Sequence, residues 1–148
     1  MTDQPITKIL SVEDDEFIRL FLKDVLWIHG TNDNIQFDMV SNIEEGKKKI
    51  EDPATRPQLV FLDLMLPQKE GEAPHLDNGL GLLEAIKTNP DLMGIKVMVF
   101  SSVKDPQIKE KVAHLGADRY MVKGEYLPAE LIAAVREMIQ SPTASASK

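Results

Sequence analysis

The stretch VFLDLMLP, residues Val60 to Pro67, contains one acidic residue, Asp63, within an otherwise apolar run. The apolar residues before Asp63 predict the end of a buried strand. An unpaired charge in such a place costs several kcal/mol, so the carboxylate needs a physical reason. We consider two reasons, a capping role at the end of the strand and a chemical role beside other charged groups.

A second apolar run, KILSVED (Lys8–Asp14), also ends in acidic residues, Glu13 and Asp14. The residues that follow place apolar side chains at helical spacing, which predicts a helix directly after the strand. Acids favour the positive end of a helix dipole. Glu13 and Asp14 could therefore belong to the start of that helix. Asp15 and Glu16, which come next in the chain, are the stronger candidates for that place.

Apolar runs and helical patterns alternate along the rest of the chain, which predicts an α/β fold with five strands, five helices and a parallel sheet covered on both faces. We expect a single domain over residues 1–141 and a disordered tail over 142–148. Strands are expected at residues 8–14, 35–40, 58–63, 94–101 and 117–123, and helices at 15–30, 42–52, 79–89, 105–116 and 127–140.

Composition narrows the range of functions. The chain has 148 residues and no cysteine, which excludes thiol redox chemistry and a disulfide framework. Acidic residues outnumber basic ones by 24 to 17, and the net charge of −7 argues against direct nucleic-acid binding by charge. No apolar run reaches the length of a membrane span, and the N-terminus lacks the pattern of a secretory signal. We therefore expect a cytoplasmic protein that does not bind membranes.

The predicted strand ends carry the residues that suggest chemistry. In open parallel sheets, ligands bind beyond the carboxyl ends of the strands. If the first and third strands are neighbours, Glu13, Asp14 and Asp63 converge and repel one another, and a hard divalent cation such as Mg²⁺ is the simplest relief. The fourth strand ends at Ser101 and the fifth at Lys123. Carboxylates, a hydroxyl, an ammonium group and a metal together suit phosphoryl transfer to a carboxylate.

Four motifs in order carry a family resemblance: VEDD after the first strand, LDLMLP after the third, FSS after the fourth and YMVK at the fifth. Together they resemble the receiver domain of two-component response regulators, of the chemotaxis-regulator type. The resemblance covers Lys8 to Gln140. It implies a flavodoxin-like, doubly wound (βα)5 fold with the strand order 2-1-3-4-5.

The resemblance also implies roles for the acidic residues and the lysine. Asp63 would be the phosphoacceptor. Glu13, Asp14 and Asp63 would hold Mg²⁺ together with the backbone carbonyl of Met65. Lys123 would pair with the phosphoryl group. The protein would be a phosphoacceptor signalling protein that catalyses its own phosphorylation from a donor, and not an enzyme in the usual sense.

Two further residues would form the switch that the resemblance implies. Ser101 would supply a hydroxyl to the phosphoryl group, and Tyr120 would turn inward on activation. The face made by the fourth helix, fifth strand and fifth helix would then change for partner binding. The implied partners are a sensor histidine kinase or histidine phosphotransfer protein and a downstream protein. We expect a stand-alone receiver, and dimerisation through the fourth and fifth helices stays open.

Several alternatives and departures accompany this interpretation. A haloacid-dehalogenase-type phosphatase needs a second aspartate at the position of Met65, which argues against that class. A receiver-like module that binds partners without phosphorylation remains the main alternative. Gly124 stands where the family commonly has proline, so the loop there could differ in shape. The segment Gln68–Asn78 is longer than usual and could contact a partner, cover the site or be disordered.

Overall fold

The computed structural model describes residues 5–29 and 34–140. The tail expected over 142–148 lies outside the described residues, as does residue 30 at the end of the first predicted helix. No helix in these two ranges is long and apolar enough to cross a membrane.

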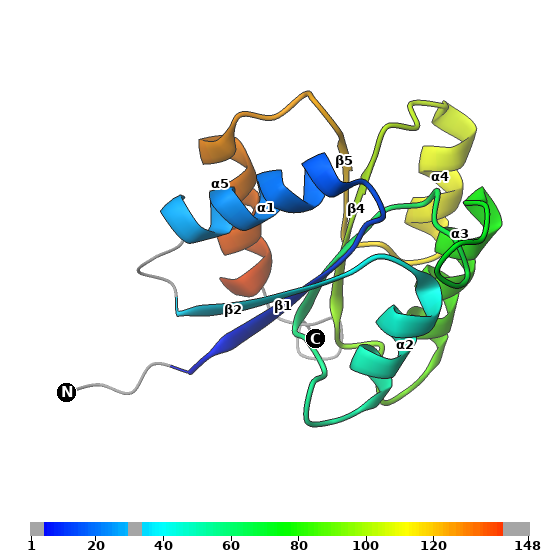
Figure 1. Ribbon diagram of the computed structural model, residues 1–148, viewed down its shortest axis with the longest axis horizontal. Helices are drawn as coiled ribbons and strands as arrows, with labels where there is room; N and C mark the ends of the chain where they lie inside the picture. Colours follow the sequence, from blue (N-terminus) through cyan, green and yellow to red (C-terminus); the bar gives the residue numbers. More distant parts are fainter. Residues whose placement is uncertain (1–4, 30–33, 141–148) are drawn as a thin grey trace.

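Five parallel strands form one sheet, as the alternating pattern predicted (Figure 1). Their order is β2-β1-β3-β4-β5, which confirms the order that the family resemblance implied. The strands are β1 (Thr7–Val12), β2 (Ile35–Val40), β3 (Leu59–Leu62), β4 (Lys96–Ser101) and β5 (Arg119–Val122).

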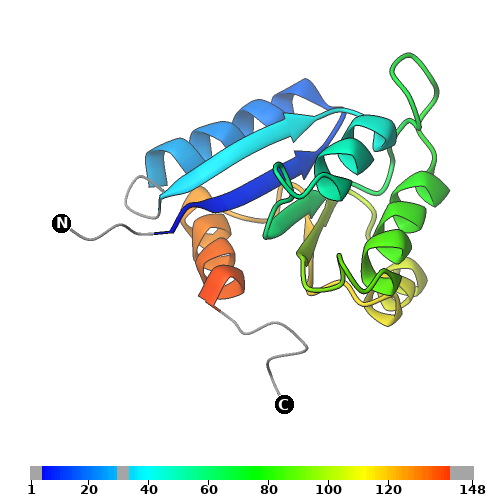
Figure 2. The same ribbon diagram turned by 90° about the horizontal axis from the view of Figure 1, so that it is seen from below.

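Five helices cover the two faces of the sheet, with α1 and α5 on one face and α2, α3 and α4 on the other (Figures 1 and 2). The helices are α1 (Glu16–His29), α2 (Ile43–Glu51), α3 (Leu76–Thr88), α4 (Pro106–His114) and α5 (Pro128–Gln140). This arrangement is the doubly wound α/β fold expected from the sequence.

Strand β3 explains why the run before Asp63 is continuously apolar. Val60 and Leu62 belong to the core beneath α2, α3 and α4. Leu59 and Phe61 belong to the second core, beneath α1 and α5. All four side chains are buried because a central parallel strand is covered on both faces.

Several predicted boundaries were wrong by two residues or more. Strand β4 begins at Lys96 and not at residue 94, and α4 ends at His114 and not at residue 116. Strand β1 ends at Val12 and not at Asp14, and β5 covers only Arg119–Val122 of the expected 117–123. Both strands stop where the charged residues of the sheet edge begin. Helix α3 begins at Leu76, three residues before the expected start at Gly79. Asn78 and Gly79 are residues typical of turns, but here they lie inside the first turn of the helix.

The long segment between β3 and α3 forms a hairpin that projects from the molecule (Figure 2). An isolated antiparallel bridge between Leu66 and His75 closes its base. A tight turn lies at its tip, where Gly71 has a φ of 87°. The backbone N–H of Ile43 donates to the Pro67 carbonyl at 3.1 Å, so the base also contacts the start of α2.

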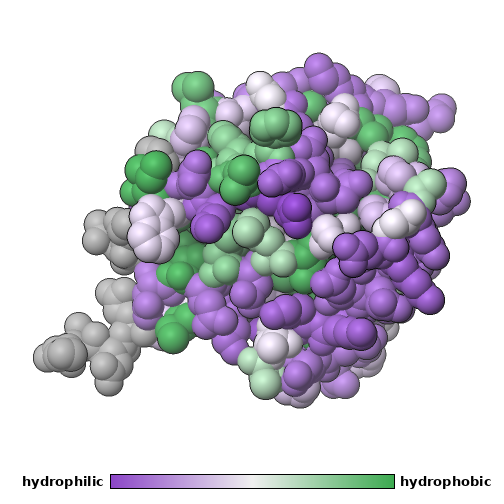
Figure 3. Space-filling view, viewed as in Figure 1, coloured by the Kyte–Doolittle hydropathy of each residue, from purple (hydrophilic) through white to green (hydrophobic). Residues whose placement is uncertain are grey.

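The face of the molecule drawn in Figure 3 is largely polar, with apolar patches that include side chains of α1. The large apolar residues that α1 exposes are Phe17, Leu20, Trp27 and Ile28. They lie on the side of the helix opposite its buried residues, such as Leu22 and Leu26. Helix α1 therefore exposes four large apolar side chains on a side that also carries the exposed Asp24.

Candidate functional site

The register of the sheet brings the acidic strand ends together. Val12 of β1 pairs with Leu62 of β3, so Glu13 and Asp63 follow at the same level of the sheet. The backbone N–H of Asp63 donates to the Val12 carbonyl at 3.1 Å, and the N–H of Glu13 donates to the Val40 carbonyl at 3.0 Å. The backbone at both strand ends is therefore fixed by the neighbouring strand.

Glu13, Asp14 and Asp63 form a compact acidic cluster. Each residue offers one carboxylate oxygen to the cluster, and these oxygens lie within 4.8 Å of one another. Glu13 is 2% exposed and Asp63 is 5% exposed, whereas Asp14 is open to solvent. The three acids that the sequence predicted to share a cation pocket are thus neighbours, with a deep side and an open side.

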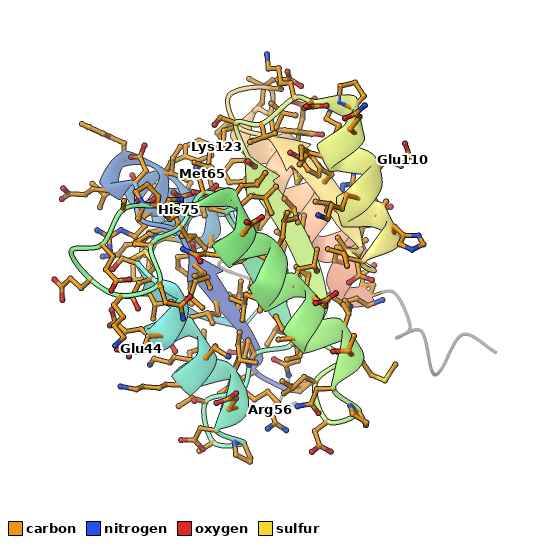
Figure 4. The ribbon with its side chains drawn as sticks, turned by 90° about the vertical axis from the view of Figure 1, so that its right-hand side faces the viewer. Glu44, Arg56, Met65, His75, Glu110 and Lys123 are labelled. Carbon is orange, nitrogen blue, oxygen red and sulfur yellow. The ribbon has the colours of Figure 1, made fainter. Side chains whose placement is uncertain are left out.

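Lys123 lies against the buried side of this cluster. Its Nζ is 2.7 Å from Glu13 Oε1 and 3.4 Å from Asp63 Oδ2. The backbone N–H of Lys123 donates to the Ser101 carbonyl at 2.9 Å, which places the lysine at the carboxyl end of β5. Figure 4 shows Lys123 and Met65 close together at one end of the molecule, with Arg56 at the opposite end.

The charges of the cluster are not balanced. Burial raises the pKa of Glu13 to about 8, and repulsion from Asp63 adds to this against the opposing Lys123. Burial also raises the pKa of Asp63, while the Lys123 charge and hydrogen bonds from Glu13 and Lys123 oppose that shift. Burial alone would lower the pKa of Lys123, but the charges of Asp63 and Glu13 outweigh it and raise the pKa. One ammonium group only partly compensates these acids, so the site favours an additional cation.

The backbone after Asp63 is held by the start of α3. The N–H of Met65 donates to the Asp63 carboxylate. The Leu64 carbonyl accepts from the N–H of Gly79 at 3.2 Å, and the Leu66 carbonyl accepts from Asn78 Nδ2 at 2.8 Å. Within 5–29 and 34–140, no hydrogen-bond donor is found on the Met65 carbonyl, so this oxygen is free to serve as a ligand.

Asn78 and Gly79 were not among the site residues predicted from the sequence. Their Asn-Gly pair is a turn signal that could have drawn attention to them. Gly79 leaves no room for a side chain, because a Cβ there would lie 2.4 Å from the Leu64 carbonyl oxygen. Both residues therefore contact the backbone of the segment that follows the buried aspartate.

Ser101 and Tyr120 meet at the loop that follows β4. Ser101 is fully buried, and its Oγ accepts from the N–H of Val103 at 3.2 Å. The Tyr120 hydroxyl donates to the Val103 carbonyl at 2.6 Å. Burial raises the pKa of Tyr120, and a hydrogen bond with Ser101 opposes this. The two residues expected to form a switch are thus linked through Val103.

The other acids near the start of α1 have a structural role. Asp15 Oδ1 accepts from the N–H groups of Phe17 at 2.9 Å and Ile18 at 3.4 Å, so Asp15 caps the helix. Glu16 is the first helical residue. The alternative that acids begin the first helix therefore accounts for Asp15, which caps it, and for Glu16, which lies in its first turn, while Glu13 and Asp14 lie in the cluster.

Gly124 takes a conformation that suits glycine. The peptide bond between Lys123 and Gly124 is trans, as are all others in the described ranges, and Gly124 has a φ of 85°. A positive φ at this position is strained for other residue types. Proline could not adopt this φ, so the loop at Gly124 has a backbone conformation that the usual family residue would not allow. Lys123 nevertheless reaches the acidic cluster.

The chain is similar in sequence to known proteins of one family. Residues 9–136 match the model of the response regulator receiver domain. The chain is 26% identical over 117 residues to a probable chemotaxis protein CheY from Rhizobium etli, covering 78% of this chain and 80% of that protein. It is 29% identical over 133 residues to a probable transcriptional regulator ycf27 from Porphyridium aerugineum, covering 90% of this chain and 48% of that protein.

The fold is also similar to solved structures. The crystal structure of the phosphorylated cyanobacterial phytochrome response regulator RcpA superposes with a TM-score of 0.74 at 23% identity, covering 97% of this chain and 98% of that one. The chain spans about half the length of the ycf27 relative, so this match concerns only part of that longer protein. From the match over residues 9–136, the chain belongs to the response regulator receiver domain family, whose members are signalling proteins of two-component systems.

Proposed function

We propose that this protein accepts a phosphoryl group on Asp63 from the phosphohistidine of a sensor kinase or histidine phosphotransfer protein. An oxygen of Asp63 forms the new bond to phosphorus, and the bond between phosphorus and the donor nitrogen breaks with its electron pair left on the imidazole. The single observation that carries this proposal is the position of Asp63, a buried carboxylate 3.4 Å from Lys123 and beside two further acids.

The donor set fits a hard divalent cation, for which we propose Mg²⁺. Glu13, Asp14 and Asp63 would hold it with the Met65 carbonyl, all of them oxygen ligands of the kind that Mg²⁺ prefers. When bound, the ion would offset negative charge on the transferring oxygens. The Lys123 charge opposes the rise that burial causes in the pKa of Asp63, and its ammonium group is placed to pair with the phosphoryl group on the buried side of the cluster.

Signalling would follow from the residues at β4 and β5. We propose that Ser101 turns toward the phosphoryl group and gives up its bond to the Val103 N–H. Because Val103 also accepts from Tyr120, this change would move the aromatic side chain and the face made by α4, β5 and α5. A downstream protein would read that face.

The phosphodonor would dock along α1. This helix begins beside the acidic cluster, and its exposed apolar residues start with Phe17, two positions after the cap. Exposed apolar side chains along a helix that leads away from the site suit a helical partner that carries a phosphohistidine. We also propose a cytoplasmic location and a receiver domain over residues 1–141, wider than the 9–136 that match the family model.

Labelling with radioactive acetyl phosphate and Mg²⁺ tests the proposal. We expect acid-stable, base-labile label on the wild-type protein and none on Asp63→Asn. Asp91→Asn, which changes an exposed carboxylate remote from the cluster, should be labelled like the wild type. Full labelling of Asp63→Asn would mean that another residue accepts the phosphoryl group and that the proposal is wrong. An unlabelled wild type that still binds partners would favour the phosphorylation-independent module.

A further inference from the structure

The segment that follows Asp63 is held by hydrogen bonds on both sides of Met65. The Leu66 carbonyl accepts from Asn78 Nδ2 at 2.8 Å and from the N–H of His75 at 3.0 Å. The Leu64 carbonyl accepts from the N–H of Gly79 at 3.2 Å. The two peptide groups on either side of the Met65–Leu66 peptide are therefore held from the start of α3.

Among these donors, Asn78 is the one side chain. His75 occupies the N-cap position of α3, and its side chain makes no capping bond there. Asn78 directs its amide away from its own helix and onto the Leu66 carbonyl. A residue whose purpose was to begin the helix would bond the helix N–H groups, so the direction of this bond indicates a role in the loop.

We propose that Asn78 is a positioning residue for the cation site: its hydrogen bond to the Leu66 carbonyl fixes the Leu66–Pro67 peptide group, one peptide beyond the Met65 carbonyl, and so limits the directions in which that carbonyl can point. The inference deepens the proposed function and rests on it. Partners of a metal ligand that hold its orientation commonly affect metal affinity as strongly as a weak ligand does.

The closed base of the hairpin limits how far movement at its tip can reach Met65. Its base is held at Leu66, so the exposed tip between Lys69 and Glu72 is separated from Met65 by the Asn78 bond and the His75 bridge. Without Asn78, the Leu66 carbonyl would keep only the backbone bond from His75. The Met65 carbonyl would then sample other directions while the carboxylates stayed in place.

The test measures the dissociation constant for Mn²⁺ by electron paramagnetic resonance, together with the melting temperature with and without Mg²⁺. Asn78→Leu keeps the branched shape of the side chain, although it is larger, and removes the donor. We expect its Mn²⁺ dissociation constant to rise about tenfold, and the gain in melting temperature from Mg²⁺ to shrink. Asn78→Ala removes the same donor and supplies the measurement if the leucine variant does not fold.

Glu70→Ala is the matched control, because Glu70 lies at the exposed tip of the same hairpin. Its dissociation constant should stay within about twofold of the wild type, as expected for a surface change outside the network. If the Asn78 variants lose melting temperature but bind Mn²⁺ as the wild type does, the residue is structural and this inference is wrong. If the wild type itself does not bind Mn²⁺, the proposed cation site fails as well.

Discussion

The two sides of the acidic pocket differ in how firmly they are held. On the side of β1 and β3, Glu13 and Asp63 continue buried strands, and α3 fixes the backbone after Asp63. On the side of β4 and β5, Ser101 and Tyr120 each make a hydrogen bond to the backbone of Val103 in the loop after β4, and Tyr120 is half-buried. The difference suggests a division of labour in which one side positions the chemistry and the other side is able to rearrange.

The largest expected effect probes the firm side. In Gly79→Ala, the new Cβ would lie 2.4 to 2.7 Å from three backbone atoms of Leu64, which cannot move without displacing the strand end. We expect a loss of about 3 kcal/mol in the free energy of unfolding, the upper range for overpacking. Urea denaturation followed by circular dichroism measures this.

Gly81 in the same helix provides the control. Nothing lies within 4 Å of a Cβ built there, so Gly81→Ala should stabilise the protein by about 0.5–1 kcal/mol through helix propensity. Equal effects of the two substitutions would show that the contact between α3 and Leu64 is not tight, and the contrast between the two sides of the pocket would disappear.

A smaller effect concerns the pH dependence of cation binding on the same side. The pKa of Glu13 lies at about 8, above its ordinary value of 4.5, so the metal-free folded protein retains a proton that the unfolded chain has lost between these values. The metal-free protein should therefore lose stability as pH rises through this range. A cation must displace the proton, so its affinity should rise about tenfold per pH unit up to about pH 8 and then level off.

Calorimetric titration of Mg²⁺ at pH 6.5, 7.5 and 8.5 measures this slope. In Glu13→Gln, affinity should be weaker at every pH and the slope should be much smaller, because the group that titrates is gone. A wild-type affinity that does not change over this range would mean that Glu13 is already ionised, and that Lys123 compensates it more fully than we infer.

The smallest expected effect lies on the movable side. Tyr120→Phe removes the hydroxyl that donates to Val103 and leaves the ring beneath Lys109, whose Nζ is 5.6 Å from the ring centroid. We expect a loss of about 1 kcal/mol, the usual net value of one hydrogen bond. Tyr126→Phe, also half-buried, should change stability by less. If Tyr120→Phe lowered the free energy of unfolding as much as Gly79→Ala, the two sides of the pocket would be held equally firmly and the contrast drawn here would be wrong.

Sequence patterns predicted the sheet and the acidic cluster well, because both can be recognised from changes between apolar and polar residues along a short stretch of chain. The change from apolar to acidic residues at Glu13 and Asp63 marks a strand end, and parallel strands bring their carboxyl ends to one edge. The family resemblance supplied the strand order. These features need no knowledge of which side chains touch across the fold.

The start of α3 and the role of Asn78 could not be predicted in the same way. Polar residues before Gly79 are typical of a loop, yet Leu76 and Asp77 belong to the first turn of α3, which contacts the segment after the strand through the bond from Gly79 to Leu64. The Asn78 bond spans 12 residues and requires the hairpin to close first. Its partner, the Leu66 carbonyl, carries no mark in the sequence, because every residue has such a group.

The closed base of the β3–α3 hairpin has a practical consequence. Because the ends of the hairpin are fixed at Leu66 and His75, changes at its tip should not propagate to the pocket, and the native chain contains no thiol that would compete for a label. A fluorophore attached through Glu70→Cys would therefore label the protein at one position without disturbing the residues beside Asp63. Such a label would allow the binding of a partner protein to be followed by fluorescence anisotropy while the pocket stays unaltered.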